Sequence, residues 1–128
     1  MDHSHPRKQC ILLVEDNEVI RSIFESMLQN MGCAVITAEN GEDGLAAFGR
    51  HRHRINAIIT DLKMPVMNGI TMIDRIRQID EDVPIAIVTA YDHAGRRGIE
   101  KRLNVRHFNK PADVEELVSF LLGEHVAQ

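Results

Sequence analysis

The sequence predicts an α/β domain in which a five-stranded parallel sheet carries helices on both faces. Five short apolar runs alternate along the chain with five segments whose apolar residues recur every three or four positions. Uninterrupted apolar runs are typical of strands buried on both faces of a parallel sheet, and this alternation is typical of the whole architecture. The length of 128 residues suits a single domain.

The apolar runs predict strands over residues 10–14, 33–38, 57–59, 85–90 and 105–108. Right-handed crossovers between parallel strands place all the carboxyl ends at the same edge of the sheet. Ligands of open α/β sheets bind outside that edge. Residues that directly follow the strands are therefore the first candidates for a functional site.

The first two helices follow from periodicity and from turn residues. Apolar residues form one helical face between residues 19 and 31, and Gly32 ends that helix. The second helix follows the Asn40–Gly41 turn and fades at Gly49. Residues 51–54, with two histidines and two arginines, are predicted to form a solvated basic loop.

The remaining helices differ in how clearly the sequence predicts them. A third follows Gly69 and shows a regular apolar face. The segment 92–104 is densely basic and contains Gly95 and Gly98, each of which costs up to about 1 kcal/mol in a helix interior. We expect a short or mobile helix there. The last helix carries acidic residues in its first turn, between residues 113 and 116, which suits the helix dipole.

Composition excludes several classes of protein. The chain is 44% hydrophobic and 27% charged, and its net charge of −4 gives no reason to expect nucleic-acid binding. It has neither an apolar run long enough to span a membrane nor a signal peptide, which predicts a cytoplasmic protein. Cys10 and Cys33 are expected to be small buried hydrophobes. We expect a disordered lead-in over residues 1–8, the domain over 9–123 and a tail over 124–128.

Polar residues gather at the predicted strand ends: Glu15 and Asp16 after the first, Asp61 after the third, Thr89 at the fourth and Lys110 after the fifth. Carboxylates in one pocket resist ionising together, and a Mg²⁺ ion with retained waters removes that conflict. A lysine and a threonine nearby can hold an oxyanion, so the set suits a carboxylate that attacks phosphorus and becomes an acyl phosphate. The acids also have structural interpretations: Asp16 or Asn17 could cap the helix that follows, and Asp61 could cap or brace its loop.

These residues lie in motifs that resemble the receiver domain of response regulators, the CheY-like phosphoacceptor of two-component signalling. The matching stretches are Val14–Asn17, Asp61–Gly69, Val88–Ala90 and Lys110–Pro111. The resemblance extends from about Gln9 to Leu122. It implies a doubly wound, flavodoxin-like (βα)5 fold with strand order 2-1-3-4-5.

The resemblance also implies a reaction. Asp61 would accept a phosphoryl group from a phosphohistidine on a histidine kinase or a histidine phosphotransfer protein. Mg²⁺, or Mn²⁺ in its place, would be bound by Asp16, Asp61 and the backbone carbonyl of Lys63, with Glu15 acting directly or through water. Such a protein catalyses its own phosphorylation and dephosphorylation and does not turn over a small substrate many times.

Further residues take roles from the same resemblance. Lys110 would pair with the phosphoryl group, and Thr89 would donate a hydrogen bond to it. The peptide bond before Pro111 would be cis, although a proline there also suits a simple helix start. Lys63 and Tyr91 occupy positions that influence how long the phosphate lasts.

One position departs from the family pattern. An aromatic residue commonly lies three positions before the lysine and moves together with the threonine, whereas this chain has His107, followed by Phe108. Either His107 is the switch residue or switching differs, and a histidine there could make the response depend on pH. Strand alternation places Phe108 on the opposite face, where we expect a core position.

Several interpretations of function stay open. In the first, a partner protein reads a change in residues 89–110, the basic segment 92–104 forms an output surface, and the chain is a monomer or a weak dimer through its 85–122 face. The chain is then either a stand-alone receiver or part of a hybrid histidine kinase. In the second, it is a degenerate receiver that acts as a protein-interaction module. A third interpretation is a flavin- or nucleotide-binding protein, although the first strand of this chain is not followed by the Gly-rich turn typical of that class. A fourth is a hydrolase that uses Asp61 as its nucleophile.

Overall fold

The structure, a computed structural model, describes residues 8–90 and 95–123. Tyr91, the predicted tail and the predicted lead-in up to residue 7 lie outside these residues. Strands and helices alternate as predicted: β1 (Cys10–Val14), α1 (Glu18–Asn30), β2 (Ala34–Ala38), α2 (Gly41–His51), β3 (Ala57–Thr60), α3 (Gly69–Ile79), β4 (Ile85–Thr89), α4 (Arg96–Leu103), β5 (Arg106–Asn109) and α5 (Val114–Leu122). All neighbouring strands pair in parallel, in the order β2-β1-β3-β4-β5, which confirms the predicted fold.

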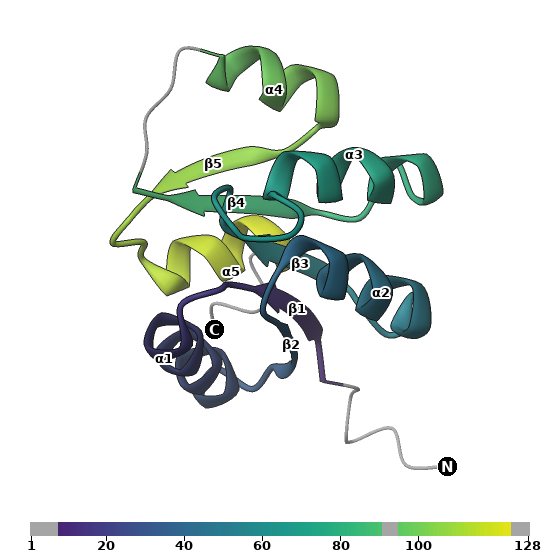
Figure 1. Ribbon diagram of the computed structural model, residues 1–128. Coiled ribbons are helices and arrows are strands. Elements are labelled where there is room, and N and C mark those ends of the chain that lie inside the picture. The colour runs from purple at the N-terminus through teal and green to yellow at the C-terminus, as the bar shows by residue number, and fades with distance from the viewer. Residues whose placement is uncertain (1–7, 91–94, 124–128) are drawn as a thin grey trace.

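The helices lie on both faces of the sheet (Figure 1). One apolar cluster joins α1 and α5 to the sheet, and a second joins α2, α3 and α4 to the opposite face. Side chains of β1 alternate between them, since Ile11 and Leu13 belong to the first cluster and Leu12 and Val14 to the second. Every residue of β1, β3 and β4 is buried. Two-sided burial therefore explains why these strands are apolar without alternation.

The strand register brings the carboxyl ends together. Val14 pairs with Thr60, and Thr60 pairs with Ile87. Thr89, at the end of β4, pairs with Asn109 at the end of β5. The residues that follow β1, β3 and β5 therefore leave the sheet at the edge where β4 ends.

Helix α1 begins and ends at the residues that the sequence indicates. The side chain of Asn17 caps its first turn, and Gly32 follows its last turn with a φ of 90°. Strand β2 begins at Ala34, one residue later than predicted. The reason is that the Cys33 N–H donates to the Leu28 carbonyl at 3.1 Å, so Cys33 closes the helix instead of joining the sheet.

The apolar face of α1 is wider than the surface that covers it. Leu28 is fully buried, whereas Val19, Ile23 and Met27 are 67%, 55% and 44% exposed. These three residues belong to the periodic face that the sequence predicts. Periodicity thus located the helix and the side that faces the sheet correctly, but it did not distinguish the apolar residues that the sheet buries from those that stay exposed to solvent.

Helix α2 extends to His51, two residues beyond the predicted fading point at Gly49. The predicted basic loop consequently starts at Arg52, and His51 is helical. Arg50 and His51 occupy the last turn, where positive groups interact favourably with the carboxyl end of a helix. This interaction favours continuation of the helix past Gly49, whose own helix propensity is weak.

Helix α4 has eight residues and confirms the prediction of a short helix; its mobility stays a prediction. Its N-cap residue, Gly95, has no side chain with which to cap the first turn. Its last turn is held by Arg77 of α3, whose Nε donates to the Leu103 carbonyl at 2.7 Å and whose Nη2 donates to the Asn104 carbonyl at 2.9 Å. The helix is therefore anchored at its carboxyl end.

Cys10 and Cys33 are buried free thiols, which confirms the expectation that they act as small hydrophobes. Burial raises the pKa of both thiols. Among the helices of the described residues, none has the length and apolar character needed to cross a membrane.

Candidate functional site

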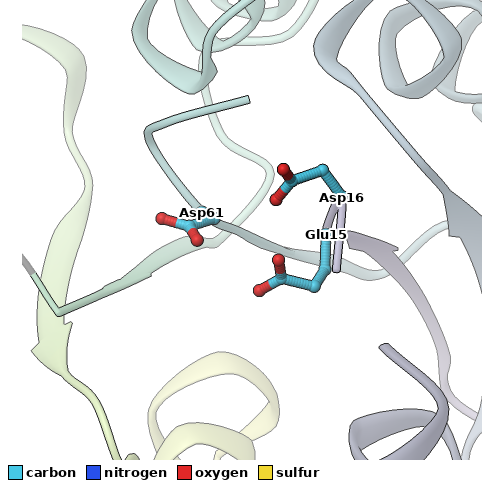
Figure 2. Close-up of side chains that lie close together, drawn as sticks. All are labelled: Glu15, Asp16 and Asp61. Atoms are coloured by element: carbon cyan, nitrogen blue, oxygen red, sulfur yellow. The ribbon is translucent and has the colours of Figure 1, made fainter. Parts of the chain in front are cut away.

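Three carboxylates lie at the carboxyl edge of the sheet. Glu15 and Asp16 follow β1 and Asp61 follows β3, and Figure 2 shows their side chains gathered at these two strand ends. Each offers an oxygen atom, and these atoms lie within 4.8 Å of one another. Glu15 is buried, Asp61 is half-buried and Asp16 is exposed. The edge thus concentrates negative charge in a site that is open on one side.

Lys110 inserts its ammonium group between two of these acids. Its Nζ lies 3.0 Å from Oε1 of Glu15 and 2.8 Å from Oδ2 of Asp61. Its own N–H donates to the Thr89 carbonyl at 2.9 Å, and its peptide bond to Pro111 is cis. Lys110 therefore links the ends of β1, β3 and β4 from the loop that follows β5.

The ionisation of this cluster reflects burial and charge together. Burial raises the pKa of Glu15, and this effect exceeds the opposing hydrogen bonds from Asn17 and Lys110. Burial by itself would lower the pKa of Lys110, but its hydrogen bonds to Asp61 and Glu15 raise it above the ordinary value. Lys110 therefore stays protonated at neutral pH and compensates part of the negative charge.

Asp61 is oriented by its own loop. Its Oδ1 accepts the Leu62 N–H at 2.6 Å, and its main-chain carbonyl accepts the Thr60 hydroxyl at 2.8 Å. The Gly69 N–H donates to the Leu62 carbonyl at 2.8 Å and closes the loop. Gly69 packs so closely on the Asp61 carbonyl that an added Cβ would overlap it. The motif from residues 61 to 69 therefore needs glycine at its end for steric reasons.

The donor set fits a hard divalent cation. Mg²⁺ prefers oxygen ligands, keeps several of its waters and is usually held by one or two carboxylates. An open hollow lined by Asp16 and Lys63 adjoins the carboxylates and leaves room for such waters. The acidic group is therefore of the kind at which receiver domains bind Mg²⁺.

Thr89 and His107 are both buried, in neighbouring strands. Thr89 ends β4 and is 2% exposed. The His107 side chain is enclosed on the face of the sheet that α4 covers, where Oε2 of Glu100 accepts the His107 N–H at 2.7 Å and lies 3.3 Å from the ring Nδ1. Burial opposes ionisation of Glu100, but its contacts with His107 and Arg96 lower its pKa overall. The predicted switch position is thus tied to α4 through one carboxylate.

Phe108 lies on the opposite face from His107, as predicted, but it is only half-buried. Its ring centroid is 5.7 Å from that of Phe120 in α5. The guanidinium of Arg106 lies 4.9 Å and 5.4 Å from these two centroids. Phe108 thus packs against the apolar cluster beneath α1 and α5, as expected for a core position, but edge strand β5 leaves this face partly open to solvent.

Sequence reasoning missed Arg21. Its Nη1 donates to the Glu15 carbonyl at 2.8 Å and lies 3.5 Å from the Asp16 carbonyl. A signal was available, because helical side chains point toward the helix N-terminus and Arg21 lies one turn after Asn17, the cap residue. The guanidinium consequently reaches back over the loop that carries the acidic pair.

Fold and site together define a doubly wound parallel α/β protein with an acidic group and a lysine at the carboxyl edge of its sheet. The chain belongs to the response regulator receiver domain family, whose family model matches residues 11–122. This confirms the resemblance to CheY-like proteins of two-component signalling.

Individual relatives agree with this assignment. The chain is 32% identical over 108 residues to sporulation initiation phosphotransferase F of Bacillus subtilis, with 84% of this chain and 86% of that protein covered. It is 39% identical over 83 residues to the probable transcriptional regulator ycf27 of Guillardia theta, covering 65% of this chain but 32% of that protein. The crystal structure of chemotaxis protein CheY4 of Vibrio cholerae superposes with a TM-score of 0.79 at 28% identity, covering 88% of this chain and 95% of the other.

Proposed function

We propose that Asp61 is the phosphoacceptor of a two-component or phosphorelay system in the cytoplasm. The observation that carries the proposal is the position of its carboxylate, which lies beside the acidic pair and has its Oδ2 2.8 Å from the Lys110 ammonium. A carboxylate in such a site can act as a nucleophile, because the neighbouring positive charge balances negative charge that develops during phosphoryl transfer. The donor is a phosphohistidine on a histidine kinase or a histidine phosphotransfer protein.

Asp16, Asp61 and the backbone carbonyl of Lys63 would hold the Mg²⁺ ion, and Glu15 would contribute directly or through water. When bound, the ion neutralises phosphoryl oxygens and the repulsion among the carboxylates. The Asp61 side chain is 12% exposed, and a phosphohistidine would approach it from the open side of the site. Glu15, whose side chain is 5% exposed, also holds the Lys110 ammonium.

In the transfer step, an oxygen of Asp61 forms a bond to phosphorus as the bond from phosphorus to the donor imidazole nitrogen breaks. The leaving nitrogen keeps the electron pair of that bond, so a donor ring that carries a proton on its other nitrogen departs as neutral imidazole, and the product on this chain is an acyl phosphate. Lys110 exchanges its contact with Asp61 for one with a phosphoryl oxygen. Thr89 donates its hydroxyl hydrogen to another phosphoryl oxygen.

A partner protein then reads the change in residues 89–110. The hydrogen bond from the Lys110 N–H to the Thr89 carbonyl connects the two groups that respond to the phosphate. His107 would act as the switch residue, and Lys63 and Tyr91 would influence the lifetime of the phosphate. The domain spans residues 9–123 and acts as a monomer or as a weak dimer through its 85–122 face. It works either as a stand-alone receiver or as part of a hybrid histidine kinase.

Intact mass spectrometry tests the proposal. The wild type, Asp61→Asn and the control Asp74→Asn, which alters an exposed aspartate of α3, are incubated with Mg²⁺ and either acetyl phosphate or a phosphorylated histidine phosphotransfer domain. We expect one phosphoryl group on the wild type and the control, removable by hydroxylamine as an acyl phosphate, and none on Asp61→Asn. A folded wild type that gains nothing from either donor would instead support a degenerate receiver that acts by contact alone.

A further inference from the structure

Arg21 holds the main chain of the acidic pair from the first turns of α1. Its Nη1 donates to the Glu15 carbonyl at 2.8 Å and approaches the Asp16 carbonyl at 3.5 Å. Its Nη2 lies 3.6 Å from Oε1 of Glu39, which follows β2. The Arg21 side chain is 15% exposed, whereas that of Glu39 is 70% exposed. The contact with the Glu15 carbonyl is therefore the sheltered part of this arrangement, whereas the longer contact with the Asp16 carbonyl and the ion pair with Glu39 are exposed.

The two acids depend on this contact to different degrees. Glu15 is fixed on several sides, since its N–H donates to the Ala38 carbonyl at 3.0 Å and its side chain contacts Lys110 and the Asn17 N–H. Asp16 is exposed, so the direction of its carboxylate follows mainly from the main chain between Glu15 and Asn17. Arg21 contacts the main-chain carbonyls of Glu15 and Asp16, which flank the Cα atom that carries the Asp16 side chain. Its loss would release the exposed acid more than the buried one.

Charge and geometry predict opposite effects of Arg21 on a cation at this site. A guanidinium close to the acidic pair repels a divalent cation, so removing only its charge would strengthen cation binding. A guanidinium that orients a ligand has the reverse effect, because side chains that support metal ligands typically raise metal affinity about ten- to hundredfold. The sign of the change in affinity therefore separates the two roles.

We infer that Arg21 is a positioning residue for the Mg²⁺ site, which holds the loop of residues 15–17 so that the Asp16 carboxylate faces the Asp61 carboxylate. The inference rests on the proposed function, because it assigns a supporting side chain to the site at which Asp61 is phosphorylated. It predicts that the geometric contribution of Arg21 outweighs its repulsion of the cation.

Calorimetric titration with Mg²⁺ alone, without a phosphodonor, tests this assignment. In Arg21→Met we expect the Mg²⁺ dissociation constant to rise about tenfold. Arg21→Lys keeps the charge, but its ammonium ends one bond closer to the main chain than Nη1, the nitrogen that contacts both carbonyls, so it should hold the loop less well and also bind Mg²⁺ more weakly than the wild type. Two controls should stay close to wild type: Glu39→Gln, which removes only the exposed ion pair, and Arg75→Met, which removes one exposed positive charge from α3.

Thermal unfolding without Mg²⁺ establishes that each variant is folded, and amide hydrogen exchange at Asp16 and Asn17 reports on the loop directly. Faster exchange there together with weaker Mg²⁺ binding supports the positioning role. Tighter or unchanged binding in both Arg21 variants would overturn it, even if the wild type is phosphorylated on Asp61. If Arg21→Met does not fold, Arg21→Lys decides by the same criterion. A wild type that binds no Mg²⁺ would overturn the proposed metal site and this inference with it.

Discussion

Replacing Lys110 by methionine removes the ammonium that bridges Glu15 and Asp61 while keeping much of the side-chain volume. The loss involves two charge-assisted hydrogen bonds, of 3.0 Å and 2.8 Å. Each such bond contributes about 1.5–3 kcal/mol. Because the Lys110 side chain is 20% exposed, water replaces part of this interaction, and we expect Lys110→Met to lower the free energy of unfolding by about 2 kcal/mol at neutral pH.

The effect should depend on pH in a defined direction. The pKa of Lys110 is raised, so its stabilising charge is fully present below the ordinary lysine value and is lost only in alkaline solution. Between about pH 5 and pH 8, any change in the effect must come from the carboxyl groups. Burial already raises the pKa of Glu15, and removing Lys110 raises it further. The destabilisation of the variant should therefore shrink as the pH falls and Glu15 takes up a proton.

Urea denaturation of wild type and Lys110→Met at neutral pH and at about pH 5 measures this difference. The exposed Lys101→Met variant in α4 serves as a control for the loss of one positive charge. Mg²⁺ should restore part of the stability of Lys110→Met at neutral pH, because a bound cation would compensate the same carboxylates. A destabilisation equal at both pH values, or larger in acid, would refute the assignment of Lys110 as the counterion of a buried carboxylate.

Two further predictions concern positions near the site. Val66 is 75% exposed and has a φ of 69°, a left-handed conformation that costs about 1–2 kcal/mol. Glycine relieves this strain but adds entropy to the unfolded chain, which offsets part of the gain. Val66→Gly should therefore raise the free energy of unfolding by about 0.5–1 kcal/mol and the melting temperature by about 2–4 °C. A lower melting temperature in calorimetry would count against strain at Val66. The pKa of Glu100 is lowered, so its contribution to stability is present above the ordinary glutamate pKa and is lost as the pH falls through the folded value. Glu100→Gln should therefore lower the free energy of unfolding by up to about 1 kcal/mol at neutral pH and have no effect in strong acid. Urea denaturation of both proteins across this pH range measures the difference, and a difference that grows toward low pH would contradict the prediction.

The fold was predictable because local and global signals agree in this chain. Strands buried on both faces require apolar runs, and Asn17, Asn40 and Asn68 each cap the helix that follows. Such patterns depend on neighbours in sequence, so they can be recognised without coordinates. The extension of α2 to His51 escaped prediction because favourable charges at a helix end offset one glycine, and only the folded chain shows which effect is larger.

The site was predictable as a set of residues but not as a set of contacts. Parallel pairing brings strand ends together, which placed Glu15, Asp61 and Lys110 at one edge. Lys110 and Glu15 are 95 positions apart, however, and no local pattern indicates that the lysine would bridge both acids. The same holds for His107, whose enclosure beside Glu100 depends on how α4 packs against β5.

Lys110 joins the proposed chemistry to the proposed output. Its side chain contacts Asp61 while its N–H donates to the Thr89 carbonyl, so the group that responds to charge at β3 is attached to the end of β4. Under the proposed function, a phosphoryl group on Asp61 would attract both the ammonium and the Thr89 hydroxyl, which belong to residues joined by this main-chain hydrogen bond. Since β5 is an edge strand that contacts α4 through Glu100 and His107, such a change would act on an element with a neighbouring strand on one side only. Residues 89–110, which we propose a partner reads, are therefore the residues that these hydrogen bonds join to the carboxylate site.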